Sequence, residues 1–268
     1  MSRTRLIASL ATFAVVATPA AAQAKTVISM SGSTSVAPLA RSLAKKYASI
    51  DRSLSFKLLQ GGSDTGITDV SRGRVTIGNA SRDPQSADPG GLVFNKIARD
   101  AVCVITNRSN PIANLSQAQV QAIFTGKVRS WKDVPGAKAK GAISLITRTA
   151  ASGTGDAFKN IFLGPNLSVA ASSSAKGSNG LVNQGVRSNP DAIGFVSLDF
   201  VTEGIAAAGY KGVPCTLRNA KSGQYGGVRN FWMVTRGKAT GKAATWIKWI
   251  QNSPVARRIV NTKWISIR

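Results

Sequence analysis

The chain has 268 residues, with 35 Lys and Arg against 11 Asp and Glu, a net charge of +24 at pH 7 and no histidine. Without histidine it cannot use Ser-His-Asp or Cys-His nucleophile activation or a His-bearing zinc site, and its few carboxylates form no close pair of the acid–base type. The length suits one large domain or two lobes with a real core, and the composition argues against an enzyme.

Residues 1–24 have the pattern of a cleavable signal peptide. Arg3 and Arg5 make the start basic, Leu6 to Val16 is mostly apolar, and Ala22-Gln23-Ala24 is a small-x-small cleavage site. The apolar stretch is too short to span a bilayer, and no cysteine stands directly after the cleavage point, so we expect no lipoprotein anchor. We therefore expect an exported, periplasmic mature chain that begins near Lys25 and contains no membrane span.

Strand–loop–helix units follow the signal peptide. Val27 to Met30 reads as a strand, Ser31 to Ser35 as a small polar loop, and Val36 to Tyr47 carries apolar residues at helical spacing. Such alternation predicts a parallel α/β sheet, in which ligands bind at the carboxyl ends of the strands. The next two units have strands at 54–59 and 75–77 and loops at 60–66 and 78–84.

The two cysteines lie far apart, and Cys103 belongs to an apolar run that predicts a strand over 96–105. In an oxidising compartment Cys103 and Cys215 can pair. Two buried free thiols are the alternative, and the sequence leaves both open.

Residues 147–158 combine a loop of small polar residues with one cation. A strand over 143–146 leads to Arg148 and to Ser152-Gly153-Thr154, and a helix with Phe158 follows. Backbone N–H groups at a helix start and a guanidinium both suit an oxyanion. The alternative is a simple helix cap and turn.

The remaining elements complete the α/β pattern. A polar, Ser-rich connection is expected over 172–179, and no acidic residue follows Glu203 although twelve Lys and Arg do. Those cations are scattered and lack interleaved aromatics, so we expect no specific nucleic-acid partner. Strands are expected over 192–198 and 230–235, and helices near 115–124, 181–186, 246–250 and 255–260.

Several phrases, taken in order, resemble the phosphate-binding proteins of bacterial ABC phosphate importers, a branch of the type 2 periplasmic binding proteins. They cover nearly all of the mature chain. They are Gly-Ser-Thr-Ser-Val-Ala-Pro-Leu (32–39), Gln-Gly-Gly-Ser-Asp-Thr-Gly-Ile (60–67), Ile-Gly-Asn-Ala-Ser-Arg (77–82), Asn-Leu-Ser-Gln-Ala-Gln-Val-Gln-Ala-Ile-Phe-Thr-Gly-Lys (114–127), Trp-Lys-Asp-Val (131–134), Arg148 with Ser152-Gly153-Thr154, and Asn-Pro-Asp-Ala-Ile-Gly-Phe-Val (189–196).

The resemblance implies a two-lobe α/β fold with the anion in the cleft between the lobes. The first lobe would hold 25–100 and 206–268, and the second 101–205. It also implies a set of donors, which matches what a desolvated oxyanion needs. The phosphate-binding residues that it implies are Thr34, Ser35, Ser63, Ser81, Arg82, Arg148, Ser152, Gly153 and Thr154.

Two positions depart from the family pattern. Many members have an Asp in the third loop, which accepts the proton of phosphate and repels fully ionised sulfate; here Ser81 and Arg82 stand in that loop. Many also pair the Arg with an acidic residue two positions later, where this chain has Ala150. Asp156 is then a candidate partner for Arg148.

The sequence therefore predicts a monomeric periplasmic receptor that delivers inorganic phosphate to an inner-membrane ABC permease, without catalysis, metal or cofactor. Receptors for sulfate, arsenate or a phosphorylated metabolite are alternatives of the same class. A secreted basic polyanion-binding or adhesion protein on this fold is an alternative of another class, as is a hydrolase that uses Ser152, which the lack of histidine disfavours.

Overall fold

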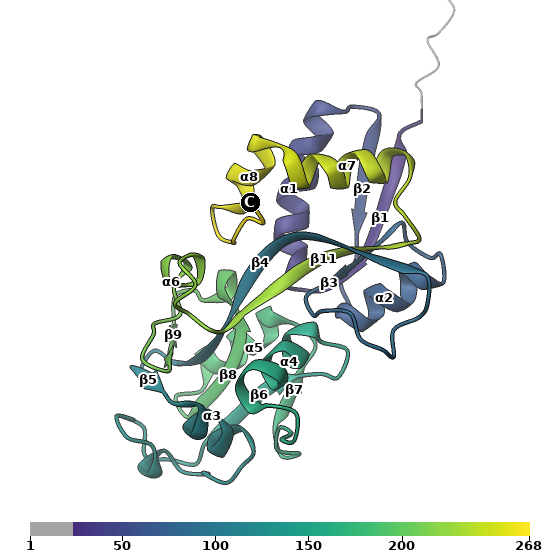
Figure 1. Cartoon of the computed structure of the whole chain (residues 1–268). Coiled ribbons are helices and arrows are strands. Elements are labelled where there is room, and N and C mark those ends of the chain that lie inside the picture. The colour runs from purple at the N-terminus through teal and green to yellow at the C-terminus, as the bar shows by residue number, and fades with distance from the viewer. Residues whose placement is uncertain (1–23) are drawn as a thin grey trace, which may run out of the picture.

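The computed structural model describes residues 24–268, so all but the last residue of the predicted signal peptide lies outside the described residues. Two α/β lobes are joined by long strands that run from one lobe into the other (Figure 1). Across residues 24–268 no helix has both the length and the apolar character needed to cross a bilayer.

One sheet runs through both lobes. Its strand order is β2-β1-β3-β11-β4-β8-β6-β7, with β9 paired beside β4, and β10 and β5 form a separate two-stranded sheet. The strands are β1 Thr26–Gly32, β2 Leu54–Leu58, β3 Ile77–Ala80, β4 Leu92–Asn107, β5 Asn114–Leu115, β6 Ser144–Arg148, β7 Ser174–Lys176, β8 Ala192–Ser197, β9 Ile205–Ala207, β10 Gly209–Tyr210 and β11 Val228–Arg236.

The α-helices follow the strands in the alternation that the sequence predicts. Short 3-10 turns at Trp131–Asp133 and Leu198–Phe200 and a π-helical turn at Lys159–Leu163 complete the connections. The α-helices are α1 Val36–Ile50, α2 Ser63–Ser71, α3 Gln117–Phe124, α4 Gly153–Phe158, α5 Asn179–Ser188, α6 Leu217–Lys221, α7 Gly241–Asn252 and α8 Pro254–Val260.

The first lobe has helices on both faces of its part of the sheet. Leu39 and Leu43 recur on one side of α1 and are fully buried, together with residues of α7 and α8. Successive residues of a strand point to opposite faces. Phe231 and Met233 of β11 accordingly enter this core, whereas Val234 enters a smaller core under α2.

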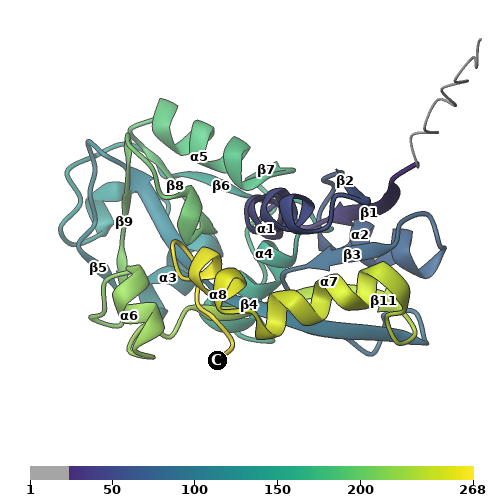
Figure 2. The same ribbon diagram turned by 90° about the horizontal axis from the view of Figure 1, so that it is seen from above.

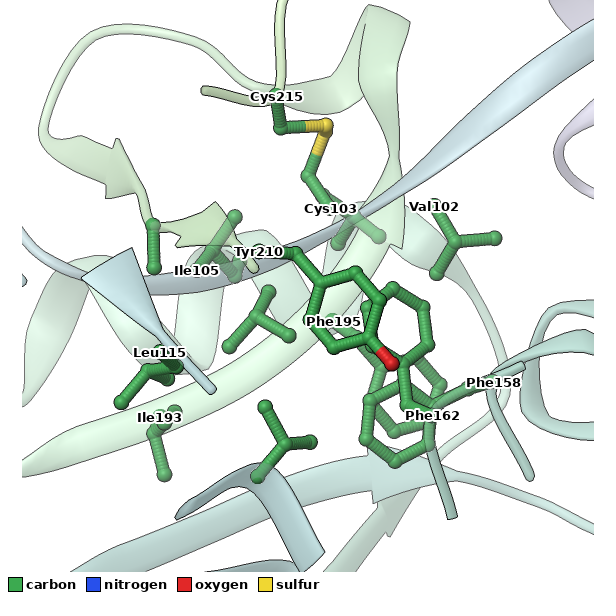
Figure 3. Packing of buried hydrophobic residues seen from close by; sticks show 14 of the residues in the cluster. Val102, Cys103, Ile105, Leu115, Phe158, Phe162, Ile193, Phe195, Tyr210 and Cys215 are labelled. Atoms are coloured by element: carbon green, nitrogen blue, oxygen red, sulfur yellow. A yellow bond between two sulfur atoms is a disulfide. The ribbon is translucent and has the colours of Figure 1, made fainter. Parts of the chain in front are cut away.

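An aromatic cluster forms the core of the second lobe (Figure 3). The Phe158 ring stacks on Phe195 of β8 with 3.9 Å between the ring centroids and also packs against Phe124 of α3 at 4.6 Å. Aromatic pairs contribute stability beyond the area that they bury. Because Phe158 is the last residue of α4, this core holds the helix that begins at the Ser-Gly-Thr loop.

The sheet is mixed, although strand–helix alternation predicted a parallel one. β1, β2 and β3 are parallel, as are β6, β7 and β8, but β11 is antiparallel to β3 and β4, and β4 to β8. The reason is the connection between the lobes: β4 carries the chain out of the first lobe and β11 brings it back. Residues 174–176, expected in a polar connection, form the edge strand β7.

The segment 206–225 packs with the second lobe, although the family resemblance implied the first. Tyr210, Cys215, Ala220 and Tyr225 are buried in the same cluster as residues of β4 and β8. The limits of the two lobes stay a prediction, and this packing favours a second lobe that extends toward residue 227.

A disulfide between Cys103 and Cys215 answers the question that the sequence left open. Cys103 lies on β4 and is fully buried, and Cys215 precedes α6. The bond ties the segment that contains β9, β10 and α6 to β4 across a sequence separation of 112 residues (Figure 3).

We expect reduction of this disulfide to lower the free energy of unfolding by about 2–5 kcal/mol, because a long loop then regains its freedom in the unfolded chain. Urea unfolding with and without dithiothreitol measures the change. A Cys103→Ala/Cys215→Ala variant controls for the reductant, since its midpoint should not respond. An equal midpoint for oxidised and reduced protein would contradict a stabilising role.

Candidate oxyanion-binding site

The cleft between the lobes collects the buried polar residues of several loops. α1 and α4, whose first turns contact each other, lie where the two lobes adjoin (Figure 2). The helices α1, α2, α4 and α5 all begin here, so their N-terminal partial charges add to the site. The buried polar side chains are Ser33, Thr34, Ser35, Ser63, Ser81, Arg148, Ser152, Thr154, Asn179 and Arg229.

Hydrogen bonds of hydroxyl groups connect the three loops of the first lobe that follow β1, β2 and β3. Ser33 Oγ accepts hydrogen bonds from the backbone N–H of Ser35 at 3.2 Å and of Val36 at 3.3 Å. It donates in turn to Ser81 Oγ at 2.8 Å. Ser63 Oγ accepts from the Ser81 N–H at 3.0 Å. The loops after β1, β2 and β3 therefore form one preorganised surface.

Direct hydrogen bonds join this surface to the second lobe. Ser35 Oγ lies 2.9 Å from Thr154 Oγ1. Arg148 Nη2 donates to Thr34 Oγ1 at 3.2 Å. Asn179 Nδ2 donates to both Thr34 Oγ1 at 3.0 Å and Ser35 Oγ at 2.8 Å. Donors of both lobes thus meet around the same few atoms.

Gly153 allows this close approach. A Cβ atom at Gly153 would overlap Ser63 Oγ and lie 2.9 Å from Ser63 Cβ and 3.0 Å from the carbonyl carbon of Ser81. On the other side of the cleft, Gly62 has a φ of +101°, and a Cβ there would overlap the carbonyl oxygen of Ala151. Both glycines are required because backbone and side chains from the two lobes touch here.

Arg148 is the buried cation that the sequence placed in the cleft. Besides Thr34 it is held by two carbonyls, those of Lys176 (3.1 Å from Nε) and Gly177 (3.1 Å from Nη2). Its Nη1 is buried and has no hydrogen-bond acceptor among residues 24–268. Burial, and then the nearby charge of Arg229, lower the pKa of Arg148 to about 9. The site is therefore short of negative charge and of acceptors.

Asp156 is not the partner of Arg148, so that prediction is wrong. Its carboxylate accepts from Gln85 Nε2 at 3.0 Å and from Asn160. Asp156 lies on α4 past the Ser-Gly-Thr loop and faces a hollow lined by Gln85 and Arg82. The carbonyls at the end of β7 hold Arg148 instead.

Arg82 is buried beside the cleft but turned away from the hydroxyls. Its Nε donates to Asp64 at 2.8 Å, and its two terminal nitrogens donate to Asp88 at 3.0 and 2.6 Å. Ser81 and Arg82 lie in the bend after β3, where the Ser81 hydroxyl bonds to Ser33 in the cleft while Arg82 joins the loop to Asp64 of α2. None of its hydrogen bonds reaches another predicted site residue.

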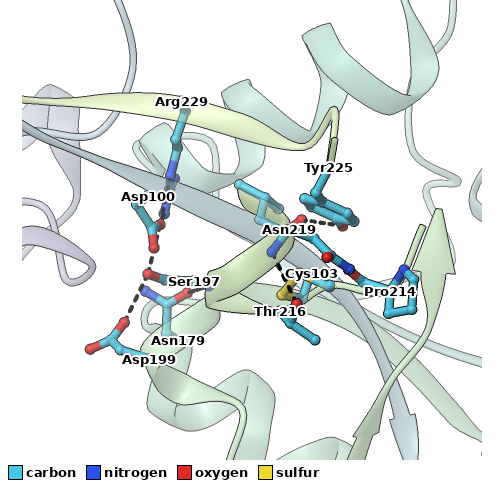
Figure 4. The surroundings of a disulfide bond; sticks show 12 residues. Asp100, Cys103, Asn179, Ser197, Asp199, Pro214, Thr216, Asn219, Tyr225 and Arg229 are labelled. Carbon is cyan, nitrogen blue, oxygen red and sulfur yellow. Dashed lines mark hydrogen bonds and ion pairs between the residues drawn. A yellow bond between two sulfur atoms is a disulfide. The ribbon is translucent and has the colours of Figure 1, made fainter. Parts of the chain in front are cut away.

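A second buried arginine, Arg229 of β11, points toward Asp100 of β4 (Figure 4) and reaches the hydroxyls of the cleft. Its Nη2 donates to Ser35 Oγ at 2.8 Å and its Nη1 to Ser81 Oγ at 3.3 Å. Asp100 of β4 lies opposite it in the sheet register and accepts from Nε at 3.1 Å and Nη2 at 2.9 Å. A paired, hydrogen-bonded arginine is the form in which a buried charge is tolerated.

A second carboxylate, that of Asp199, lies near this ion pair and shares Ser197 with Asp100. Ser197 Oγ lies 2.7 Å from Asp100 Oδ2 and 2.8 Å from Asp199 Oδ1 (Figure 4). Burial, and then the charge of Asp100, raise the pKa of Asp199 to about 7. A hydroxyl has one proton to donate, so Ser197 can donate to only one of these two carboxylates at a time.

Asn179, Arg229 and Asp100 are site residues that sequence reasoning missed. Asn179 begins α5 just after a Ser-rich stretch, and a polar residue at the start of a helix following a strand end is the signal that could have marked it. Arg229 reads as one more cation of a basic C-terminal segment. Its pairing with Asp100 depends on the β4–β11 register, which the sequence does not show.

By fold, this is a two-lobed α/β protein of the type 2 binding-protein arrangement, with a donor-lined cleft between the lobes. Comparison with known families agrees. The chain belongs to the PBP superfamily, whose domain model matches residues 19–254.

Several similar proteins bind or transport phosphate, as their names state. The phosphate-binding protein PstS of Bacillus subtilis is 27% identical over 237 residues, which are 87% of this chain and 78% of that protein. A solved structure of a putative phosphate ABC transporter substrate-binding protein from Clostridium perfringens, with bound phosphate, is 29% identical, has a TM-score of 0.85 and covers 91% of this chain and 100% of its own. An ABC-type phosphate transport receptor from Vibrio cholerae is 26% identical with a TM-score of 0.74, covering 90% and 100%.

Proposed function

We propose that this chain is a periplasmic receptor that captures inorganic phosphate between its lobes and delivers it to an ABC importer of the inner membrane. The observation that carries the proposal is Arg148. It is a buried guanidinium where the lobes meet, and its Nη1 has no acceptor within the part of the chain that the structure describes. A tetrahedral oxyanion supplies both the acceptor oxygens and the negative charge that this group requires.

The proposed ligands are all donors. Each oxygen of a desolvated phosphate must be met by N–H or O–H groups, and both lobes contribute them, so binding and lobe closure reinforce each other. The proposed ligands are the hydroxyls of Thr34, Ser35, Ser63, Ser81, Ser152 and Thr154, the backbone N–H of Gly153 and the guanidinium of Arg148. We assign Arg82 to holding the third loop against Asp64 and Asp88.

The names of the relatives support phosphate and an importer as the ligand and the partner. We propose no catalytic step, because Ser152 Oγ accepts from the N–H groups of its own helix at 3.2 and 3.1 Å and the chain contains no histidine to activate it. The periplasmic location rests on the N-terminal pattern of residues 1–24, and we propose a monomer that acts alone in capture.

Titration calorimetry of the refolded mature chain tests the proposal. Unfolding and dialysis first remove any anion carried through purification. We expect phosphate to bind at one site per chain with a Kd of about 1 µM or tighter, and chloride and nitrate to give no comparable heat. Absence of phosphate binding, or sulfate binding tighter than phosphate, would contradict the proposed function.

A further inference from the structure

Four hydroxyls of the cleft, those of Thr34, Ser35, Ser81 and Ser152, are set as donors by their protein neighbours. A hydroxyl oxygen has two lone pairs and one proton. Thr34 Oγ1 accepts from Arg148 and Asn179, and Ser152 Oγ accepts from two backbone N–H groups. Both lone pairs of each oxygen are therefore occupied, and each has only its proton left to offer.

Arg229 completes this pattern at the two central hydroxyls. Ser35 Oγ accepts from Asn179 at 2.8 Å and from Arg229 at 2.8 Å, so the proton of Ser35 is left for Thr154 or for a ligand. Ser81 Oγ accepts from Ser33 at 2.8 Å and from Arg229 at 3.3 Å, so Ser81 too has only its proton to offer. The Arg229 guanidinium thus occupies one lone pair of Ser35, in the loop after β1, and one lone pair of Ser81, in the loop after β3.

Other side chains separate the carboxylates from the cleft hydroxyls. Asp100 forms hydrogen bonds with Arg229 and Ser197, and Asp199 forms one with Ser197. The cationic groups are Arg148 and Arg229, and the pKa of Arg148 is lowered by the second of them. A ligand in the cleft therefore faces hydrogen-bond donors and positively charged groups.

We propose that Arg229, held by Asp100, is a positioning and specificity-determining residue that sets Ser35 and Ser81 as donors, so that the cleft binds tetrahedral dianions and distinguishes phosphate only weakly from sulfate. This inference rests on the proposed function for its choice of ligands. A P–OH group needs an acceptor, and Ser35 and Ser81 provide none while Arg229 is in place. Hydrogen phosphate then binds through its ionised oxygens much as sulfate does, and dihydrogen phosphate binds less well.

Calorimetry with inorganic phosphate and with sulfate, each across mildly acidic to mildly alkaline pH, tests the inference. Sulfate does not titrate there, so its affinity reports any titration of the protein, Asp199 included. We expect phosphate to be preferred by less than about 100-fold, the level that a site without a dedicated acceptor reaches. We also expect the phosphate-to-sulfate affinity ratio to fall as the pH drops and phosphate becomes a monoanion.

A double variant, Arg229→Met/Asp100→Leu, removes the guanidinium together with its counterion, which avoids a lone buried charge. It returns one lone pair to Ser35 and one to Ser81. We expect both anions to bind more weakly, and sulfate to lose about tenfold more than phosphate because phosphate can now donate its proton. Arg99→Met is the matched control, because Arg99 adjoins Asp100 in β4 and makes no hydrogen bond to the cleft hydroxyls among the contacts of residues 24–268.

The outcomes separate the inference from the proposed function. A phosphate preference above about 100-fold in the wild type overturns the inference and leaves phosphate capture standing. An unchanged phosphate-to-sulfate ratio in the folded double variant also overturns it, since a purely structural role would weaken both anions equally. Binding of sulfate without phosphate overturns the proposed function but supports a cleft in which Ser35 and Ser81 act as donors, and binding of neither overturns both.

Discussion

Replacement of Arg148 by glutamine should weaken phosphate binding by at least about 100-fold, because removal of one partner of a buried, hydrogen-bonded charge pair costs about 2–5 kcal/mol. Arg148 is 8% exposed and contacts Thr34 across the cleft. Glutamine retains an amide that can bond to the carbonyls of Lys176 and Gly177. The expected loss therefore reports the missing charge and Nη1, and calorimetry measures it.

The same variant should be at least as stable as the wild type without anion. Folding lowers the pKa of Arg148, which means that the buried positive charge disfavours the folded state while the group stays protonated, below about pH 9. Its removal relieves that cost at neutral pH. Thermal unfolding of anion-free protein checks this, and a residue that merely held the fold would instead lower the midpoint.

Arg108→Gln is the matched control for charge. Arg108 belongs to the second lobe, its side chain is 73% exposed, and it lies 3.8 Å from Glu203. Its loss should leave phosphate affinity within about a factor of two, since exposed ion pairs contribute little. An Arg148→Gln variant that binds phosphate within about tenfold of the wild type would remove the basis of the proposed site.

The second large effect is expected at Gly153, where alanine should weaken phosphate binding by at least about 30-fold through a steric clash between the lobes. The added Cβ would meet Ser63 Oγ, Ser63 Cβ and the backbone of Ser81. Ser63 and Ser81 are fully buried, so neither can move aside. Closure must then stop short of the geometry in which both lobes contact the anion.

Small-angle scattering complements calorimetry here. Wild-type protein should become more compact on addition of phosphate, and Gly153→Ala should not, while the unfolding midpoint without anion stays near the wild-type value. Gly90→Ala is the control, because no atom lies within 4 Å of the Cβ that it adds. Compaction and affinity like those of the wild type in Gly153→Ala would show that the lobes need not approach as closely as they do in this structure.

The local features of the candidate site could be predicted from the sequence. The loops before α1, α2 and α4 each follow a strand and precede a helix, and Arg148 and the Ser-Gly-Thr loop lie between the lobes, although their role in binding stays a prediction. Such features depend on neighbours in sequence. Ser81 and Arg82 show the limit of that reasoning, because the sequence does not show which way each of two adjacent loop residues points, and only Ser81 faces the cleft.

Long-range pairing explains what the sequence could not show. Arg229 meets Ser35, 194 positions away, and Asn179 meets the same hydroxyl from 144 positions away. Both contacts follow from the way β4 and β11 connect the lobes, and strand–helix alternation carries no information about that connection. The disulfide between Cys103 and Cys215 depends on the same crossing, which brings 206–225 back to β4.

The central claim is that the cleft captures phosphate, and the anion that the protein itself retains tests it most directly. The protein is secreted into medium that contains phosphate and sulfate in equal amounts and is purified in buffers that contain neither anion. It is then denatured, and the released anions are quantified by ion chromatography. We expect about one phosphate per chain, at an excess over sulfate, and none from Arg148→Gln. Release of sulfate in place of phosphate, or equal phosphate from the Arg148→Gln variant, would contradict the account.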